Sequence, residues 1–111
     1  MDAAQERRYL LKDFYGDNYL LAPYITKYRS NKKLAILLFS EDGALFCDMT
    51  VNITDSNTCD SNCAFVDTNN SPWLIDFIQD NALGKKTGRF GVSGFCSYPE
   101  FAFDLAKMNE E

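Results

Sequence analysis

Carboxylates are the side chains in this sequence best suited to chemistry, because histidine is absent. That absence excludes a histidine-based catalytic triad, a histidine metal ligand and a histidine proton shuttle. A pair of carboxylates working as acid and base is the remaining option, but no spacing singles out two of them. The candidates are Asp48, Asp67, Asp76, Glu100 and Asp104. The sequence therefore favours a protein that is not an enzyme and that needs no cofactor.

Two short motifs partly match known ligand sites. Cys59 and Cys63 have a spacing that zinc sites use, with Cys47 and Cys96 as the only thiols left to complete the set. Those two lie in apolar surroundings, and no second close pair exists, so we predict no metal site. The segment Gly84–Gly88 lacks the first glycine of a phosphate-binding loop and is typical of a helix end followed by a turn.

Acidic and basic residues are distributed unevenly along the chain. Sixteen acids and eleven bases give a net charge of −5, and the isoelectric point is about 4.6. Residues 41–80 contain eight acids and no Lys or Arg, whereas Lys85, Lys86 and Arg89 form a small basic cluster. An acidic stretch can attract a basic partner protein, or it can simply keep a solvated face charged. Either interpretation makes nucleic acid an unlikely partner.

The segment 89–99 combines aromatic residues with glycines. Arg, Phe and Tyr are the residue types enriched at the centres of protein interfaces, so Arg89, Phe95 and Tyr98 are candidates for a recognition loop. The alternative interpretation places Phe95 in the core and uses the glycines for a β-bulge.

Hydrophobic periodicity predicts an α+β fold. Residues 3–12 favour a short N-terminal helix, and residues 72–83 have helical spacing, with Ser71 as the expected N-cap and Gly84 as the expected stop. Residues 34–39, 44–53, 63–66 and 101–105 read as strands, and Asp42–Gly43 as a hairpin turn. We expect an antiparallel sheet of about four to six strands with the 72–83 helix packed on one face.

The length of 111 residues predicts a single domain spanning 1–111. Residues 1–16 are expected to form a peripheral helical segment, and residues 107–111 a loose tail. The N-terminus has no apolar stretch typical of a signal peptide, and no apolar run is long enough to cross a bilayer. These features predict a cytoplasmic protein with no membrane partner.

The second half of the chain resembles a known family. The resemblance rests on five motifs and on their order and spacing: Asn62–Asn70, Leu74–Ile78, Asn81–Gly84, Thr87–Arg89 and Ser93–Phe101. They resemble a domain of unknown function found in small bacterial proteins encoded on plasmids, conjugative elements and phages, over residues 34–105. The resemblance carries over no catalytic residue. It implies a mobile-element setting, in which small acidic proteins often inhibit host defence nucleases.

Three hypotheses follow. The first is a non-enzymatic binding protein that occupies a basic surface of a host or element-encoded protein. The second is an accessory regulator of transcription or conjugation that uses the basic clusters 29–33 and 85–89 for weak nucleic-acid contacts. The third is an enzyme with a site built from Asp67, Asn69, Asn70 and Arg89, although Asp67 also fits a turn-stabilising role. The predicted partner-binding residues are Asp55, Asp60, Asp67, Asn69, Asn70, Asp76, Asp80, Arg89, Phe95 and Tyr98.

Overall fold

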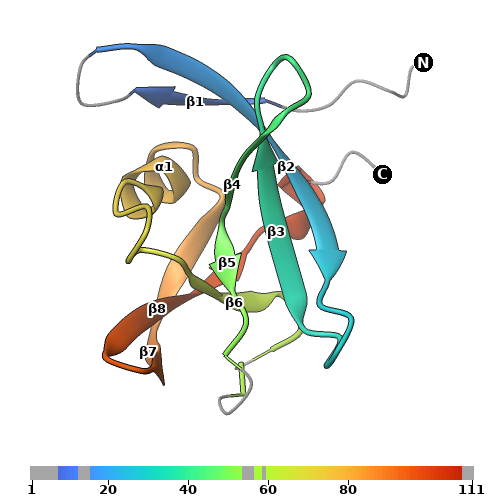
Figure 1. The fold of residues 1–111 in the computed structure, drawn as a ribbon, viewed down its shortest axis with the longest axis vertical. Coiled ribbons are helices and arrows are strands. Elements are labelled where there is room, and N and C mark those ends of the chain that lie inside the picture. Colours follow the sequence, from blue (N-terminus) through green and yellow to red (C-terminus); the bar gives the residue numbers. More distant parts are fainter. Residues whose placement is uncertain (1–7, 13–15, 54–56, 59, 109–111) are drawn as a thin grey trace.

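Two antiparallel β-sheets form most of the molecule in the computed structural model (Figure 1). The structure describes residues 8–12, 16–53, 57–58 and 60–108. One sheet has the strand order β1-β2-β3-β4 and the other β5-β6-β8-β7. In these residues the elements are β1 (Tyr9–Lys12), β2 (Asn18–Lys27), β3 (Leu34–Phe39), β4 (Leu45–Asp48), β5 (Thr50–Val51), β6 (Cys63–Val66), α1 (Leu74–Asp80), β7 (Gly84–Ser93), β8 (Cys96–Phe103) and α2 (Leu105–Met108).

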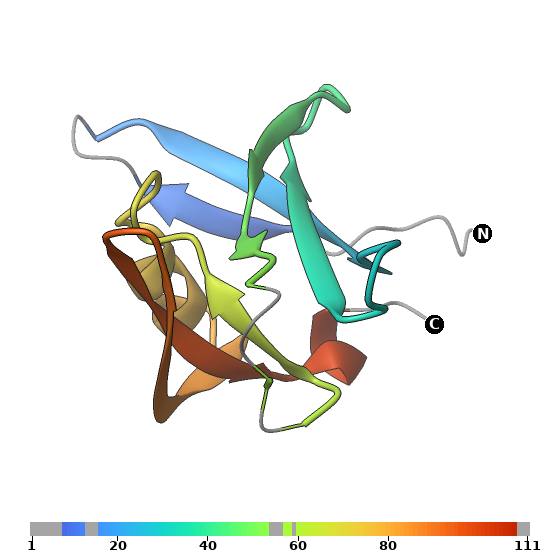
Figure 2. The same cartoon turned by 60° about the horizontal axis from the view of Figure 1, so that its bottom comes forward.

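The two sheets are joined where the chain bends at Met49. The N–H of Met49 donates to the carbonyl of Ile36 on β3, and its carbonyl accepts from the N–H of Asp67 just beyond β6. Met49 therefore links the edge of the first sheet to the edge of the second, and the sheets curl around a shared interior (Figure 2). Residues 44–53, expected as one strand, are split here into β4 and β5. Within this segment Met49 and Ile53 are buried, whereas Leu45 is exposed.

The core lies between the two sheets and α1. Inward-facing residues of β2 and β3 meet those of β6 and β8 and the buried face of α1. The members with no exposed surface include Leu21, Ile36, Leu38, Val66, Leu74, Ile78 and Phe101. The strands predicted at 34–39 and 63–66 are confirmed, and their apolar runs are buried along most of β3 and all of β6.

The predicted fold class was wrong. The structure is mostly β, and its described residues contain two short helices instead of one main helix packed on a sheet. The predicted helix 72–83 is reduced to α1, Leu74–Asp80, with Trp73 and not Ser71 at the N-cap position and no side-chain cap. It ends early because Ala82 takes a left-handed conformation (φ 54°), and Gly84 already begins β7. Gly84, predicted to end the helix, is the first residue of a strand.

The expected N-terminal helix was also wrong over its described part. Tyr9–Lys12 forms β1, which pairs antiparallel with β2, so that Leu10 lies opposite Leu20 and Leu11 opposite Tyr19. Leu11 is buried, and every second residue faces the core. The good helix propensity of this segment is overridden by pairing to β2. Residues 1–7 lie outside the described residues.

The expected loose tail is partly ordered. Leu105–Met108 forms α2, Met108 is buried, and the carbonyl of Lys107 accepts a hydrogen bond from the hydroxyl of Tyr9 at 3.0 Å. This contact joins the two ends of the described chain. The expectation was wrong here because a tertiary contact orders a segment whose own sequence has little periodicity.

Proline in β2 has a positional explanation. Proline interrupts most strands, but β2 runs through Pro23. β1 pairs only with residues 18–21, while β3 pairs with 22–27. Pro23 therefore lies where one side of β2 is without a strand neighbour, and the missing N–H leaves the ladder intact.

Candidate functional site

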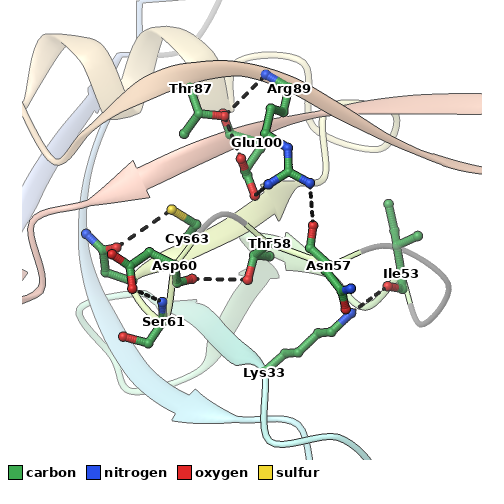
Figure 3. Close-up of polar contacts among 11 residues, drawn as sticks. Lys33, Ile53, Asn57, Thr58, Asp60, Ser61, Cys63, Thr87, Arg89 and Glu100 are labelled. Atoms are coloured by element: carbon green, nitrogen blue, oxygen red, sulfur yellow. Dashed lines mark hydrogen bonds and ion pairs between the residues drawn. The ribbon is translucent and has the colours of Figure 1, made fainter.

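A fully buried glutamate marks the most unusual polar site of the described residues. Glu100 on β8 has no exposed surface. Its Oε1 accepts a hydrogen bond from the Thr87 hydroxyl at 2.6 Å, and its Oε2 lies 3.8 Å from Nη1 of Arg89 (Figure 3). Burying a carboxylate is costly unless it is paired and hydrogen-bonded, and both conditions are met here.

A bulge in β7 brings both partners to Glu100. Lys86 pairs with Phe101 and Phe90 with Pro99, so three residues of β7 lie opposite the single residue Glu100. The middle residue of the three, Gly88, has φ 90°, a conformation that a side chain disfavours. Residues 87 and 89 can therefore both direct side chains to the carboxylate. The sequence-based expectation of a bulge in this glycine-rich segment is confirmed.

Arg89 extends the network to the loop between β5 and β6. Its Nη2 donates to the carbonyl of Asn57 at 2.7 Å, and its backbone N–H donates to the Thr87 hydroxyl at 3.2 Å (Figure 3). About half of the Arg89 side chain is exposed (48%). The guanidinium thus compensates the buried charge from the surface and ties a loop to the sheet. Because Glu100 itself is inaccessible, this arrangement supports a structural brace and not acid–base catalysis on a bound substrate.

The braced hairpin presents apolar side chains to solvent. Phe95 at the β7–β8 turn is completely exposed (109%), and Phe90 and Val92 are exposed to 63% and 62%. The alternative interpretation that placed Phe95 in the core was wrong. Tyr98 is half-buried on β8, and the pKa of its hydroxyl is raised mainly by its interaction with the Cys96 thiol. Exposed large aromatic residues on a rigid element are typical of binding surfaces.

Three of the four residues predicted to form an enzyme site lie in one turn, and the fourth, Arg89, has other contacts. The carboxylate of Asp67 is buried and accepts from the backbone N–H and the side-chain amide of Asn70, at 3.3 Å and 3.0 Å. Asn69 is exposed in the same turn, while the guanidinium of Arg89 contacts Glu100 and Asn57. Asp67 therefore stabilises the turn before α1.

The predicted acidic residues are spread over several elements. Asp76 and Asp80 are exposed on α1, one turn apart on the same side of the helix. Asp60 is exposed in the loop before β6, where its carboxylate accepts from the N–H of Ser61 at 2.8 Å. Asp55 lies outside the described residues. The turn between β7 and β8 and the helix α1 lie on the same side of the molecule in both views (Figures 1 and 2).

The thiols are separate in the described part of the chain. Cys47, Cys63 and Cys96 are not in disulfides, and no group of three or more Cys, Asp or Glu side chains placed to hold a metal occurs among the residues described. Cys59 lies outside those residues. Cys63 is buried, with its sulfur 3.7 Å from Oδ1 of Asn62.

Burial raises the pKa of the Cys47 thiol from 9.0 to about 11. Near pH 9 the fraction of thiolate is then about 50-fold lower than in the unfolded chain, so we expect iodoacetamide to alkylate Cys47 about 50-fold more slowly in the folded protein. Peptide-resolved mass spectrometry, with the urea-unfolded protein as control, measures the ratio. Equal rates would contradict the burial. The same shift favours the protonated folded state, so its contribution to stability is lost as the pH rises from about 9 to about 11.

Sequence reasoning missed the central role of Glu100 and Thr87. Glu100 was one of several candidate carboxylates, and Thr87 was considered only as part of a rejected phosphate loop. The available signal was the alternation of Phe101 and Phe103, which directs Glu100 to the opposite face of β8. Burial of that face by the β7 bulge depends on pairing between strands, which local spacing does not encode.

The fold and site define a mostly β domain of antiparallel strands with a braced, aromatic hairpin. The chain belongs to the family described as domain of unknown function (DUF4313), which matches residues 23–111. No curated protein and no solved structure matches it. None of the helices in the described residues is long and apolar enough to cross a membrane.

Proposed function

We propose that this protein is a non-enzymatic binding module that occupies a basic surface of a partner protein. The observation that carries the proposal is the complete exposure of Phe95 at the tip of a hairpin that is braced by Glu100 and Arg89. An exposed ring on a rigid support loses little conformational freedom on binding, and such residues commonly dominate interfaces. Its mobile-element origin and the inhibition of a host defence protein are parts of the same proposal.

Electrostatic attraction is the second component of the proposed contact. Asp76 and Asp80 are exposed on α1, on the side of the molecule where the hairpin tip lies. Their charges would accelerate encounter with a basic surface, and the effect would weaken with salt. Asp60 would contribute from the loop before β6.

Replacing Phe95 with alanine is expected to weaken binding of the partner about 30-fold, because a central aromatic anchor commonly contributes about 2 kcal/mol or more. The measurement is quantitative co-purification of a tagged copy from its native host, followed by titration against the recovered partner. Tyr24→Ala is the matched control, since Tyr24 is another exposed aromatic residue (56%) but lies on β2. Equal loss in both variants, or no loss with Phe95→Ala, would contradict the proposed anchor.

The charge component has its own test. A variant carrying Asp60→Lys, Asp76→Lys and Asp80→Lys should bind the same partner more slowly at low salt, and the difference should shrink at high salt. Unchanged binding at low salt would reject the acidic attraction while leaving the hairpin anchor to be judged by Phe95→Ala.

The alternative function is an accessory regulator with weak nucleic-acid contacts. It is favoured by the exposed Lys85 and Lys86 on β7, next to Arg89 and Phe90. The net charge of −5 opposes it. A gel-shift assay at low salt discriminates, because clear binding of nucleic acid supports the regulator and contradicts the primary proposal.

A further inference from the structure

β7 is an edge strand whose outer side is open. It is the last strand in the order β5-β6-β8-β7, and its ladder partner is β8. Among the described residues, no backbone hydrogen bond joins β7 to any strand other than β8. An edge strand directs the N–H and C=O groups of alternate residues away from its neighbour, where they can pair with an incoming strand.

The bulge divides this edge into two parts. Residues 87–89 lie opposite Glu100 alone, so regular pairing is restricted to Gly84–Lys86 and Phe90–Ser93. The turn of Gly94 and Phe95 is two residues long, which makes Ser93 and Cys96 the pair that exchanges hydrogen bonds. By alternation, the backbone groups of Val92 face the open side. Phe90–Ser93 is therefore the part of β7 suited to accept another strand.

One face of this edge is apolar and uncovered. Lys86, Phe90 and Val92 lie opposite Phe101, Pro99 and Ser97, which alternate along β8, and therefore share one face of the sheet. Phe90 and Val92 are both more than 60% exposed. Natural edge strands usually carry charges or bulges that prevent pairing, and on β7 these devices end at Arg89. In the segment that follows, Phe90 and Val92 are side chains typical of a strand that is paired on both sides.

The charge around the edge is positive in an acidic protein. Lys85, Lys86 and Arg89 lie on β7, and residues 81–99 contain no acid. The next acid, Glu100, is buried against Arg89. An open groove of about 540 Å³ adjoins the start of β7, with Ala82, Gly84 and Phe103 in its lining. Its charged residues are Lys85, Lys86 and Asp104, so a segment docked here would meet apolar surface beside two cations and one carboxylate.

We propose that β7 accepts an extended, acidic segment of a partner protein as an additional strand beside Phe90–Ser93. The added strand would pair its backbone with the open edge, cover Phe90 and Val92 with apolar side chains, and place acidic side chains toward Lys86 and Arg89. This inference goes beyond the proposed function, because it uses the backbone edge and the basic residues instead of Phe95 and the acids of α1.

The test uses a display library of random twelve-residue peptides selected on the intact protein. We expect the selected peptides to alternate apolar residues with Asp or Glu. In NMR titrations they should shift and protect the amides of Phe90–Ser93 before those of β1, the corresponding edge of the other sheet. Selected peptides that are basic, an absence of selected peptides, or a footprint away from β7 would overturn the proposal.

Two variants locate the contact. Val92→Pro removes the outward N–H, whereas Val92→Thr keeps it, so only the proline variant should lose peptide binding. Lys86→Glu leaves the backbone intact and should raise the dissociation constant of the acidic peptides about tenfold, while Lys27→Glu on β2 should leave it unchanged. Equal effects of the two lysine variants would overturn the proposed site.

Other occupants of the edge give different results. A single-stranded oligothymidine that displaces the selected peptides and binds more tightly would overturn the proposal in favour of nucleic acid. Concentration-dependent dimerisation that broadens the amides of residues 90–93 and is abolished by Val92→Pro would overturn it in favour of a second copy. Because Phe95→Ala should leave peptide binding within about twofold, failure of this inference is distinguishable from failure of the proposed function.

Discussion

Replacing Phe101 with alanine is expected to lower the free energy of unfolding by about 3–5 kcal/mol. Phe101 has no exposed surface and stacks on Phe103, with 6.1 Å between the ring centroids. It lies on β8, between β6 and β7, so the sheet limits how far its neighbours can move into the space left by the ring. The cost therefore combines lost apolar burial with a cavity that closes only in part.

Chemical denaturation followed by Trp73 fluorescence measures this loss. Trp73 is the single tryptophan and packs against Phe77, with 5.9 Å between ring centroids, so its emission reports on the core. Phe95→Ala is the matched control, because it makes the same chemical change on a fully exposed ring of the same hairpin. Its expected effect is within about 0.5 kcal/mol. Similar losses for both variants would contradict the assigned positions of the two rings.

Replacing Arg89 with alanine is expected to cost about 2 kcal/mol of stability. The variant leaves the Glu100 carboxylate buried with the Thr87 hydroxyl but without its cation. Breaking a buried pair commonly costs about 3–5 kcal/mol, and the expected value is smaller because half of Arg89 is solvated and the ion pair spans 3.8 Å. The hydrogen bond to the Asn57 carbonyl is lost as well, so the loop before β6 should become more susceptible to proteolysis.

A double-mutant cycle separates these effects. In a Glu100→Gln background the amide needs no cation, so Arg89→Ala should cost less than about 1 kcal/mol, mainly through the lost Asn57 contact. The coupling between positions 89 and 100 is the difference between the two costs. If Arg89→Ala costs the same in both backgrounds, the guanidinium does not compensate the buried carboxylate, and the proposed brace is wrong.

The brace connects stability to the proposed contacts. Thr87 and Arg89 hold the bulge in β7, and the strand beyond that bulge carries Phe90, Val92 and the turn with Phe95. A hairpin fixed at its base presents these side chains in one arrangement, which reduces the entropy lost on binding. Loss of Arg89 should therefore weaken the contacts that the hairpin tip makes with a partner, because the tip is then held less rigidly.

Local sequence signals were sufficient where neighbouring residues decide the structure. The Asp42–Gly43 turn is present, with Gly43 at φ 86° and the Asp42 carboxylate accepting from Ser40 and Ala44. The strands at 34–39 and 63–66 follow from apolar runs. The bulge followed from the glycines of β7. In the candidate site, residue type alone indicated Arg89 and Phe95 as candidates for a recognition loop. It did not decide whether Phe95 is exposed or buried.

The predicted fold class was wrong where pairing between strands overrides the local conformational preference. Residues 9–12 have helix-forming composition, but they pair with residues 18–21 of β2, and this pairing buries Leu11. The predicted helix is longer than the observed α1, because a glycine such as Gly84 commonly ends a helix but here begins β7. Each error assigned to local propensity a segment whose conformation is set by pairing with another strand, residues 18–21 for β1 and β8 for the start of β7.

By itself, the sequence determined the Asp42–Gly43 turn, the apolar strands at 34–39 and 63–66, the acidic balance and the absence of histidine chemistry, because each depends on residue type or on spacing between near neighbours. The tertiary structure alone decided that Glu100 is buried, that Arg89 compensates it, and that β7 ends the sheet with an open edge. These features depend on which strands pair and in which register, and a one-residue change of register would direct the same side chains to the opposite face of the sheet.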